Sequence, residues 1–333
     1  MSQSRRPEVR VFDEWVIRET VDDRLALVAA EHAFRALARG QAEVAPPLGA
    51  RFAGIFGEIH VKGAHLVGSP FFAFKFATGF YNSIEMGVPT GSGLMLLFDA
   101  ETGFPRGLLF DNGYLTDLRT AAAGGLAARL LAPARPLRVA IIGAGVQARL
   151  QLRLLARVRK LHSVRVWSRR GSSRTHFAKR MEQVIGLPVE MSEDVAQATG
   201  EADLIITATP SPTPLISPDM VQAGATIIAV GSDSPDKQEL DAHILAQADK
   251  IVTDLTGQCA ELGELHHALE AGAVAKDCVY AELGQIVDGA RPGREGDETI
   301  VCDLTGVGVQ DAAIAELAFR KLVNLPQKIT GKD

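Results

Sequence analysis

Apolar residues recur along the chain with two different rhythms. Residues 21–40 carry apolar side chains at helical spacing, whereas residues 47–111 hold short apolar runs separated by Gly, Pro, Asn and Asp. The first pattern predicts an amphipathic helix, and the second predicts a meandering antiparallel sheet. Residues 115–131 then form an alanine-rich helical pattern that Pro133 stops.

The second half of the chain alternates short β-branched runs with helical or polar segments. The first run begins near Val139, a last strand candidate lies near Thr299, and residues 311–323 have the pattern of an amphipathic helix. Strands that alternate with helices indicate a parallel, doubly wound α/β sheet. We therefore expect two domains that divide at the Pro-containing linker of residues 132–136.

Composition narrows the class of protein. Of 333 residues, 47% are hydrophobic and 23% are charged, as in an ordinary globular protein, and this length favours two cores. The net charge of −5 gives no basic face for nucleic acid and no polybasic segment for a membrane. The three cysteines lie far apart without metal-ligand spacing, and no signal-like or membrane-length apolar run occurs. We expect a cytoplasmic protein with reduced cysteines and no metal, nucleic-acid or membrane partner.

A glycine-rich turn directly follows the run that begins near Val139. Gly143, Gly145 and Ala148 form a G-x-G-x-x-A pattern, and a helical pattern follows it. In a dinucleotide-binding unit the first glycine permits the tight turn, and the second removes the Cβ that would block the pyrophosphate. The small third residue lets the helix pack on the strand, and the helix amides face the phosphates. Since both flanks fit, a nicotinamide dinucleotide is favoured over a merely structural turn.

The next strand pattern ends at Trp167-Ser168-Arg169-Arg170. A site that prefers NADH usually carries an acidic residue at this point, bonded to the ribose 2′-hydroxyl. Ser168 and Arg169 suit a 2′-phosphate instead, which favours NADPH and leaves NADH as the alternative. A solvated basic turn is the structural alternative.

Several polar motifs follow one another along the chain. They are Phe74-Lys75-Phe76, Leu115-Thr116-Asp117-Leu118-Arg119-Thr120-Ala121-Ala122, the Gly143 turn, Gly231-Ser232-Asp233-Ser234-Pro235 with Lys237 and Glu239, and Asp303-Leu304-Thr305-Gly306. Together they resemble the ornithine cyclodeaminase and mu-crystallin family over nearly the whole chain. The resemblance implies a homodimer in which residues 1–132 and 308–333 form a substrate-binding and dimerisation domain. It also implies that residues 133–307 form a Rossmann NAD(P)-binding domain, with the substrate in the cleft between the two domains.

The resemblance also implies roles for single residues. Lys75 matches the family's substrate-binding lysine and is expected to be catalytic, and Arg119 matches its carboxylate-binding arginine. Asp233 matches the acidic residue of its acid–base chemistry, while Arg51 and Gly306 are expected substrate contacts. The expected cofactor contacts are Thr90, Arg119, Gly143, Gly145, Val146, Gln147, Ser168, Arg169, Thr209, Val230, Lys237 and Thr305.

Elementary chemistry supports the three main residues. A 2-imino or 2-amino acid carries a carboxylate that Arg119 can hold bidentately and that Lys75 can hold with a point charge. Asp233 is a group that gives or takes a proton. The ordinary alternatives are that Lys75, between phenylalanines, faces solvent, that Arg119 pairs with Asp117 or Glu101, and that Asp233 only shapes a turn.

Three reactions fit the resemblance. A ketimine reductase uses NAD(P)H to convert Δ1-pyrroline-2-carboxylate to L-proline, or Δ1-piperideine-2-carboxylate to L-pipecolate. A cyclodeaminase converts ornithine to proline and ammonia with a recycled NAD, and a mu-crystallin-like protein binds NADPH or another ligand without catalysis. Because a recycled cofactor does not draw on NADPH, Ser168 favours net reduction.

Two segments favour the reductase branch as well. Residues 57–63 and 111–117 resemble the pyrroline-carboxylate reductases more than the cyclodeaminases, although proteins of ectoine utilisation share them. Glu58 and His60 of the first segment either face the substrate cleft or form a surface strand pair. We therefore predict an NAD(P)H-dependent ketimine reductase that acts on a cyclic 2-imino carboxylate.

Overall fold

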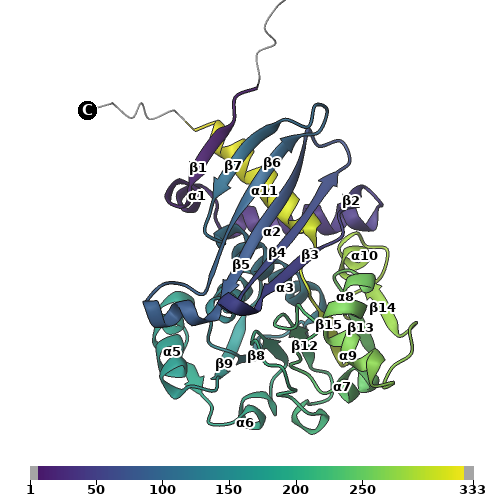
Figure 1. Cartoon of the computed structure of the whole chain (residues 1–333). Helices are drawn as coiled ribbons and strands as arrows, with labels where there is room; N and C mark the ends of the chain where they lie inside the picture. Colours follow the sequence, from purple (N-terminus) through teal and green to yellow (C-terminus); the bar gives the residue numbers. More distant parts are fainter. Residues whose placement is uncertain (1–6, 326–333) are drawn as a thin grey trace, which may run out of the picture. The chain divides into compact units, whose positions relative to one another are not determined.

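The computed structural model describes residues 7–325, which form two compact units (Figure 1). Within these residues, unit 1 comprises 7–33, 40–119 and 308–325, and unit 2 comprises 34–39 and 120–307. Helices α2 (Asp23–Ala38) and α3 (Tyr114–Leu131) contribute residues to both units. Both helices were predicted from apolar spacing, and the amide of Leu25 begins α2 by donating to Asp22 Oδ1 at 2.8 Å.

Unit 1 is built on a seven-stranded sheet in the order β1-β7-β6-β5-β4-β2, with β3 also paired to β4. The strands are β1 (Arg10–Asp13), β2 (Ala42–Val44), β3 (Leu48–Phe52), β4 (Gly57–Leu66), β5 (Phe71–Phe80), β6 (Gly91–Asp99) and β7 (Pro105–Phe110). Strands β4 to β7 are antiparallel neighbours, which confirms the predicted meander, whereas β1 joins β7 in parallel. Helix α1 (Glu14–Thr20), two short 3-10 helices (Ala53–Ile55 and Tyr81–Met86) and α11 (Gly308–Val323) complete the unit, and α11 packs on β4 and β5.

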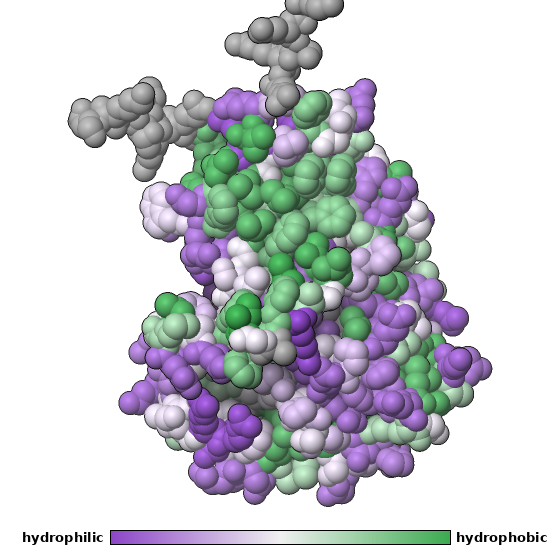
Figure 2. Space-filling model, in the orientation of Figure 1, coloured by the Kyte–Doolittle hydropathy of each residue, from purple (hydrophilic) through white to green (hydrophobic). Residues whose placement is uncertain are grey.

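The two faces of this sheet differ in character. On the face towards α11, Met95, Leu97 and Leu109 are at most 1% exposed, and the Phe319 ring lies 2.7 Å from where a Cβ of Gly107 would stand. The opposite face carries half-buried apolar side chains, seen as the green surface of unit 1 in Figure 2. They include Phe72, Phe74, Phe76, Leu94, Leu96, Phe98 and Leu108. The sheet is therefore apolar on both sides, and only one side is covered by a helix of this chain among the described residues.

Unit 2 is an eight-stranded parallel sheet in the order β10-β9-β8-β11-β12-β15-β13-β14. The strands are β8 (Leu137–Ile142), β9 (Leu161–Trp167), β10 (Val189–Met191), β11 (Leu204–Thr207), β12 (Thr226–Ala229), β13 (Lys250–Thr253), β14 (Val279–Glu282) and β15 (Ile300–Asp303). The helices are α4 (Val146–Val158), α5 (Gly171–Ile185), α6 (Val195–Thr199), α7 (Ala242–Gln247), α8 (Thr256–Leu262), α9 (Glu264–Glu270) and α10 (Leu283–Val287), with a 3-10 turn at Pro218–Met220.

This topology confirms the predicted doubly wound α/β class. The chain builds outward from β8 through β9 and then crosses to β11 on the other side of β8. Ligands of such sheets bind at the carboxyl ends of the strands, at this point of reversal. The predicted strand near Thr299 is β15, and it inserts between β12 and β13. The short edge strands β10 and β14 had no sequence prediction.

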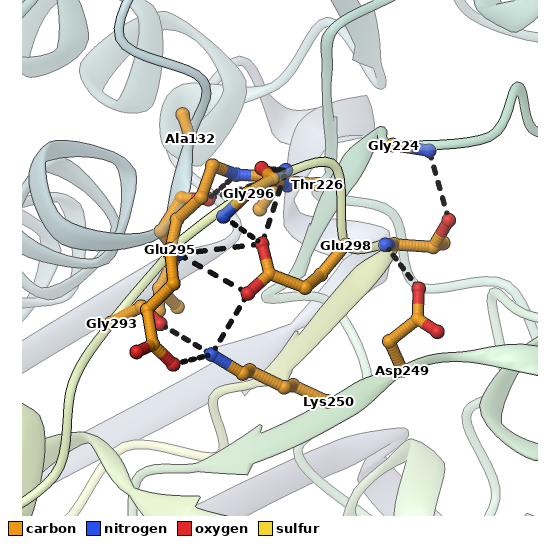
Figure 3. Close-up of polar contacts among 12 residues, drawn as sticks. Ala132, Gly224, Thr226, Asp249, Lys250, Gly293, Glu295, Gly296 and Glu298 are labelled. Carbon is orange, nitrogen blue, oxygen red and sulfur yellow. Dashed lines mark hydrogen bonds and ion pairs between the residues drawn. The ribbon is translucent and has the colours of Figure 1, made fainter.

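The amino ends of the strands carry a polar network (Figure 3). Lys250, the first residue of β13, donates to the carbonyl of Gly293 at 2.8 Å and pairs with Glu295 at 3.0 Å and Glu298 at 3.1 Å. Arg294 donates to Thr226, the first residue of β12, at 2.9 Å. The network therefore closes the sheet edge opposite the expected cofactor site. Within residues 7–325, no helix combines the length and apolarity needed to cross a membrane.

Candidate active site

The glycine-rich turn joins β8 to α4 in unit 2. Gly143 has a φ of +124°, and a Cβ there would lie 2.5 Å from the carbonyl oxygen of Ala208. Gly145 is the N-cap of α4 without a side-chain cap, and a Cβ there would meet no atom within 4 Å. Ala148 is fully buried against the sheet. The turn thus leaves open space in front of the helix amides, which fits the pyrophosphate of a dinucleotide. Val146, at 48% exposed, and Gln147 form the first helical turn behind it.

The end of β9 lies beside this turn, because Trp167 pairs with Ile142 of β8. Ser168 is nearly buried, and its carbonyl accepts a hydrogen bond from Arg174 at 2.9 Å. Arg169 is exposed at the start of the following turn. The side chains available at this strand end are therefore a hydroxyl and cations, which suit a 2′-phosphate; the cofactor preference itself stays a prediction.

A buried carboxyl group ties the loops after β11 and β12 together. Glu239 Oε1 accepts from the amide of Thr209 at 2.6 Å, and Oε2 accepts from Thr207 at 2.7 Å and from the amide of Gly231 at 2.8 Å. Burial raises the pKa of Glu239 to about 7. The expected cofactor contact Thr209 is one of these anchored positions, and the expected contact Val230 directly precedes Gly231, so Glu239 fixes the backbone that carries them.

Two further acids hold the same sheet edge. Glu264 accepts from the backbone amides of Glu239 at 2.8 Å and Leu240 at 3.1 Å. Asp303, at the end of β15, accepts from the amide of Leu265 at 2.9 Å. Burial raises the pKa of Glu264 and raises that of Asp303 to about 7. Both acids accept these hydrogen bonds from uncharged backbone amides, and in this way they organise the sheet edge.

The expected contacts Thr305 and Gly306 are held by a fourth buried acid. Asp254 accepts from the Thr305 hydroxyl at 3.0 Å and from the Gly306 amide at 2.6 Å. Gly306 has a φ of +78°, a conformation that favours glycine. The DLTG motif is therefore a fixed loop in unit 2, and its contact with a ligand stays a prediction.

Asp233 and Lys237 form an ion pair within one loop of unit 2. Lys237 Nζ lies 2.7 Å from Asp233 Oδ1, and the Asp233 side chain is 45% exposed. Asp233 can therefore shape a turn and still take part in proton transfer, because Lys237 orients its carboxylate and the carboxylate reaches solvent. The expected catalytic residue and an expected cofactor contact are thus neighbours.

In unit 1 the solvent-facing interpretation of Lys75 is wrong. Lys75 is 5% exposed on the face of the sheet that carries Met95, its partner on β6. Phe74 and Phe76 alternate to the opposite face, which is the more open one. Lys62 of β4 lies directly opposite Lys75 in the register and is 6% exposed. The strand thus buries its cation and leaves its aromatic neighbours half-exposed.

Arg51, Glu58 and His60 extend this face. Glu58 is 8% exposed, pairs in register with Arg51, and lies 3.5 Å from it. His60 Nε2 is 3.7 Å from the same carboxylate. Since alternate residues of a strand share a face, Glu58, His60 and Lys62 all point to the side of Lys75. Glu58 and His60, whose roles the sequence left undecided, therefore lie on the same face of the sheet as Lys62 and Lys75.

Arg119 is 4% exposed, and its ion pair is with Asp311, an acid that the alternative of Asp117 or Glu101 did not include. Its Nε donates to Asp311 of α11 at 2.8 Å, and its Nη1 donates to Gln310 at 3.4 Å. Helix α11 therefore holds one edge of the Arg119 guanidinium, and this fixes the direction in which its remaining N–H groups point. Thr90, another expected contact, accepts from the amide of Phe80 at 2.7 Å through its carbonyl. Substrate or cofactor contacts by Arg119 and Thr90 stay predictions.

Sequence reasoning missed three residues of these sites. Lys62 was detectable, because strand alternation from Glu58 through His60 leads to it. Glu239 belongs to the motif that begins at Gly231, but the sequence assigned no role to it. Asp311 had no local signal, since its partner Arg119 is 192 residues away in the chain.

Comparison with known proteins supports the resemblance over the whole fold. A protein of Sinorhizobium fredii described as an uncharacterized cyclodeaminase is 41% identical over 95% of this chain and 96% of its own length. The structure of Thermococcus litoralis Δ1-pyrroline-2-carboxylate reductase with NADH and L-proline has a TM-score of 0.89 at 28% identity, covering 94% of this chain and 97% of that one. The iminosuccinate reductase of Paracoccus denitrificans, solved with NAD+, has a TM-score of 0.86 at 31% identity, covering 94% and 96%.

The family model agrees with these relatives. It is described as the ornithine cyclodeaminase/mu-crystallin family, and it matches residues 11–324. The match includes the Lys75 strand, the Gly143 turn and the α11 helix that holds Arg119. The chain belongs to the ornithine cyclodeaminase/mu-crystallin family.

Proposed function

We propose that this protein is an NAD(P)H-dependent reductase of the C=N bond of a small 2-imino carboxylate. The observation that carries the proposal is the burial of Lys75 and Arg119 in unit 1, at 5% and 4% exposure. Buried cations with oriented donors are the groups that bind a carboxylate strongly. The dinucleotide turn of unit 2 supplies the second requirement of the reaction.

The cofactor is a nicotinamide dinucleotide held by the Gly143 turn. When bound, its reduced ring supplies a hydride. The open space at Gly145 and the absence of a side-chain cap on α4 support this assignment. Ser168 and Arg169 favour NADPH, while two relatives were solved with NADH or NAD+.

The chain's own residues then have three tasks. Lys75 and Arg119 hold the substrate carboxylate, and Asp311 keeps the guanidinium of Arg119 in one orientation. Asp233, or a water molecule that it holds, delivers a proton to the imine nitrogen. The carbon of the C=N bond gains a hydride and the nitrogen gains a proton, so the product is a 2-amino acid or its cyclic form.

Substrate assays test the reaction class. The purified protein is mixed with NADPH or NADH and offered 2-imino acids, among them Δ1-pyrroline-2-carboxylate and Δ1-piperideine-2-carboxylate. A separate reaction contains ornithine and NAD, because a relative carries the name cyclodeaminase. Net reduction consumes the absorbance of the reduced nicotinamide, whereas cyclodeamination releases ammonia without consuming it. Ammonia release from ornithine without reduction of any imine would replace the reductase by a cyclodeaminase, and cofactor binding without either reaction would indicate a binding protein.

Two variants test the residues. Lys75→Met and Arg119→Lys are expected to lower kcat/KM about 100-fold, because the first removes a positive charge and the second removes the bidentate guanidinium contact to the carboxylate. For Lys75→Met, which is not an expected cofactor contact, the dissociation constant of NAD(P)H, measured by nicotinamide fluorescence, should stay within about threefold. Normal turnover by both variants would contradict the site assignment.

We also infer a homodimer through the open apolar face of unit 1. Val11, Leu108, Leu96 and Phe74 lie side by side in one row across four strands. A continuous apolar surface of this kind, green in Figure 2, is typical of a protein interface. Light scattering should give a dimer for the unaltered protein and a monomer for Phe74→Glu with Leu96→Lys. A monomeric unaltered protein would contradict this.

A further inference from the structure

We infer that His266, His267 and Glu270 of helix α9 bind a zinc ion, and that the bound ion braces the loop that carries Asp233 and Lys237. The sequence predicted no metal from the spacing of its cysteines, but that spacing does not bear on these histidines. The inference does not depend on the proposed reductase, because none of the three ligands has a role in the reaction. All the residues it uses belong to unit 2, where α9 packs against α7 and α8 (Figure 1).

The three side chains converge because of their spacing on α9. Glu270 is four residues after His266 and three after His267, so its side chain lies beside both on the helix surface. One ring nitrogen of each histidine and one carboxylate oxygen of Glu270 all lie within 4.8 Å of one another. His266 Nε2 is 3.7 Å from Glu270 Oε2, and the centroids of the two imidazole rings are 5.1 Å apart. Three potential ligand atoms are thus grouped around one point.

Backbone carbonyls orient both imidazole rings. His266 Nδ1 lies 3.2 Å from the carbonyl oxygen of Ala260, and His267 Nε2 lies 2.8 Å from that of Lys237. A carbonyl oxygen only accepts, so each of these nitrogens carries the proton, and the other nitrogen of a neutral ring carries the lone pair. Histidines that bind metals are typically held in this way, with the second ring nitrogen donating to a carbonyl or carboxylate. The surroundings of both rings therefore match those of metal ligands.

The type and reach of the ligands fit zinc. Two imidazole nitrogens and a carboxylate oxygen are ligands that zinc prefers, whereas magnesium and calcium prefer oxygen alone. Ligands of one tetrahedral zinc ion stand about 3.4 Å apart, so the group must close by about 1 Å. The Glu270 side chain is 73% exposed and can move, and the His266 side chain, at 27%, is open to an ion from solvent. Water would fill the fourth position.

The site is linked to the loop of Asp233 and Lys237 through His267. The carbonyl of Lys237 accepts from His267 and also from the Ser232 hydroxyl at 2.5 Å, while Lys237 Nζ lies 2.7 Å from Asp233 Oδ1. An ion that fixes the His267 ring also fixes the donor to this carbonyl. Zinc binding should therefore reduce local opening of the loop.

Titration of the full chain with zinc chloride tests the site. The protein, without a histidine tag and freed of metal by a chelator, is titrated in a calorimeter in a buffer that does not bind zinc. One ion per chain should bind with a dissociation constant below about 50 μM, and magnesium should not compete. His266→Gln, His267→Gln and Glu270→Gln should each weaken binding at least tenfold.

The matched control is His243→Gln. His243 also pairs with a carboxylate, since its Nδ1 is 2.9 Å from Asp241 Oδ1, but the pair has no second histidine in the described group of ligands. This variant should bind zinc as the unaltered protein does. A dissociation constant above about 50 μM in the unaltered protein, or one that Glu270→Gln leaves unchanged, would overturn the site and leave an ordinary surface ion pair. Glu270 is exposed, so this variant decides even if a histidine variant fails to fold.

Hydrogen exchange tests the link to the loop. In the unaltered protein, zinc should slow exchange of the amides of Lys237 and Gln238 at least threefold, and in Glu270→Gln it should not. Exchange that zinc leaves unchanged in the unaltered protein would overturn the bracing of the loop.

Discussion

The two edges of the parallel sheet in unit 2 use carboxyl groups in opposite ways. At the amino ends, Asp203 accepts from Arg135 at 2.8 Å and from Arg138 at 2.9 Å. Burial works against ionisation of Asp203, but the hydrogen bonds from these arginines hold its pKa at about 2. At the carboxyl ends, Glu239 and Asp303 accept from amides and hydroxyls, and burial raises the pKa of each to about 7.

The difference suits what each edge does. Ionised pairs fix the amino edge, where Lys250 and its acidic partners also lie (Figure 3). The carboxyl edge must accept the phosphates of a dinucleotide, and ionised carboxylates there would repel them. Acids with pKa values near 7 can anchor loops while carrying less negative charge at neutral pH than acids with ordinary pKa values. The same type of side chain therefore serves two purposes. Cationic donors keep the carboxyl groups of the amino edge ionised, whereas amide and hydroxyl donors leave those of the carboxyl edge with raised pKa values beside the expected anion site.

The largest expected effect is the loss of cofactor binding at the carboxyl edge, without a loss of stability. Gly145→Val should raise the dissociation constant of NAD(P)H at least about 100-fold, because its side chain enters the space for the pyrophosphate. The melting temperature should change little, since a Cβ at this position meets no atom within 4 Å. The matched control is Gly296→Val, an exposed position on the amino edge, which should leave cofactor binding unchanged. Equal affinities for Gly145→Val and the unaltered protein would show that the turn holds no phosphate.

A second substitution breaks the amino edge alone. Asp203→Asn should destabilise the fold by about 2 kcal/mol, because Arg135 and Arg138 lose an ionised partner whose side chain is 1% exposed. Differential scanning calorimetry should give a melting temperature about 4–8 °C lower. The dissociation constant of NAD(P)H, measured well below the melting temperature of the variant, should stay within about twofold of that of the unaltered protein. A large loss of affinity with an unchanged melting temperature would reverse the roles assigned to the two edges.

A third substitution sharpens the chemistry of the carboxyl edge. Ser168→Asp adds the acidic residue that accepts a hydrogen bond from a ribose 2′-hydroxyl and repels a 2′-phosphate. The ratio of kcat/KM for NADPH over NADH should fall about tenfold or more. Arg169→Gln should lower the same ratio without improving the use of NADH. An unchanged ratio in both variants would mean that this strand end does not touch the ribose.

The smallest expected effect is the pH dependence of stability. The folded-state pKa values of Glu239 and Asp303, about 7, lie above their ordinary values of 4.5 and 3.8, so the folded protein retains protons that the unfolded chain releases. Their stabilising contribution is present below about pH 4 and is lost as the pH rises through 7. The melting temperature should therefore fall by a few degrees between pH 5 and pH 8, and Glu239→Gln should flatten this slope.

The amino edge should respond to pH with the opposite sign. Burial opposes ionisation of Glu298, but the amide of Gly296 and Lys250 hold its pKa at about 2, below the ordinary value of 4.5. Its contribution is present above about pH 4.5 and is lost as the pH falls towards 2. Glu298→Gln should remove part of the acid loss and leave the slope between pH 5 and pH 8 unchanged. If Glu298→Gln, and not Glu239→Gln, flattened the slope of the melting temperature between pH 5 and pH 8, the comparison of the two edges would be contradicted.

Much of the fold was readable from local pattern. Helices α2, α3 and α11 were predicted within about three residues of their ends, because their residue pattern is local. The two edge strands β10 and β14 were missed, since each has only three or four residues and little apolar pattern. The Gly143 turn was recognised from its two flanks, and the structure adds the reason: a Cβ at Gly143 would meet the carbonyl of Ala208 from a different strand end.

The sequence by itself determined the kinds of elements, the phosphate-binding turn and the family motifs, because these depend on residues close together in the chain. Only the tertiary structure decided that β15 lies between β12 and β13, that Lys75 is buried rather than solvent-facing, and that Lys62 stands opposite it. It also decided that Asp311 holds Arg119 and that Glu239 ties two loops. Strand order, the choice of the covered face and long-range charge pairs depend on contacts between distant residues, and local periodicity does not encode those contacts.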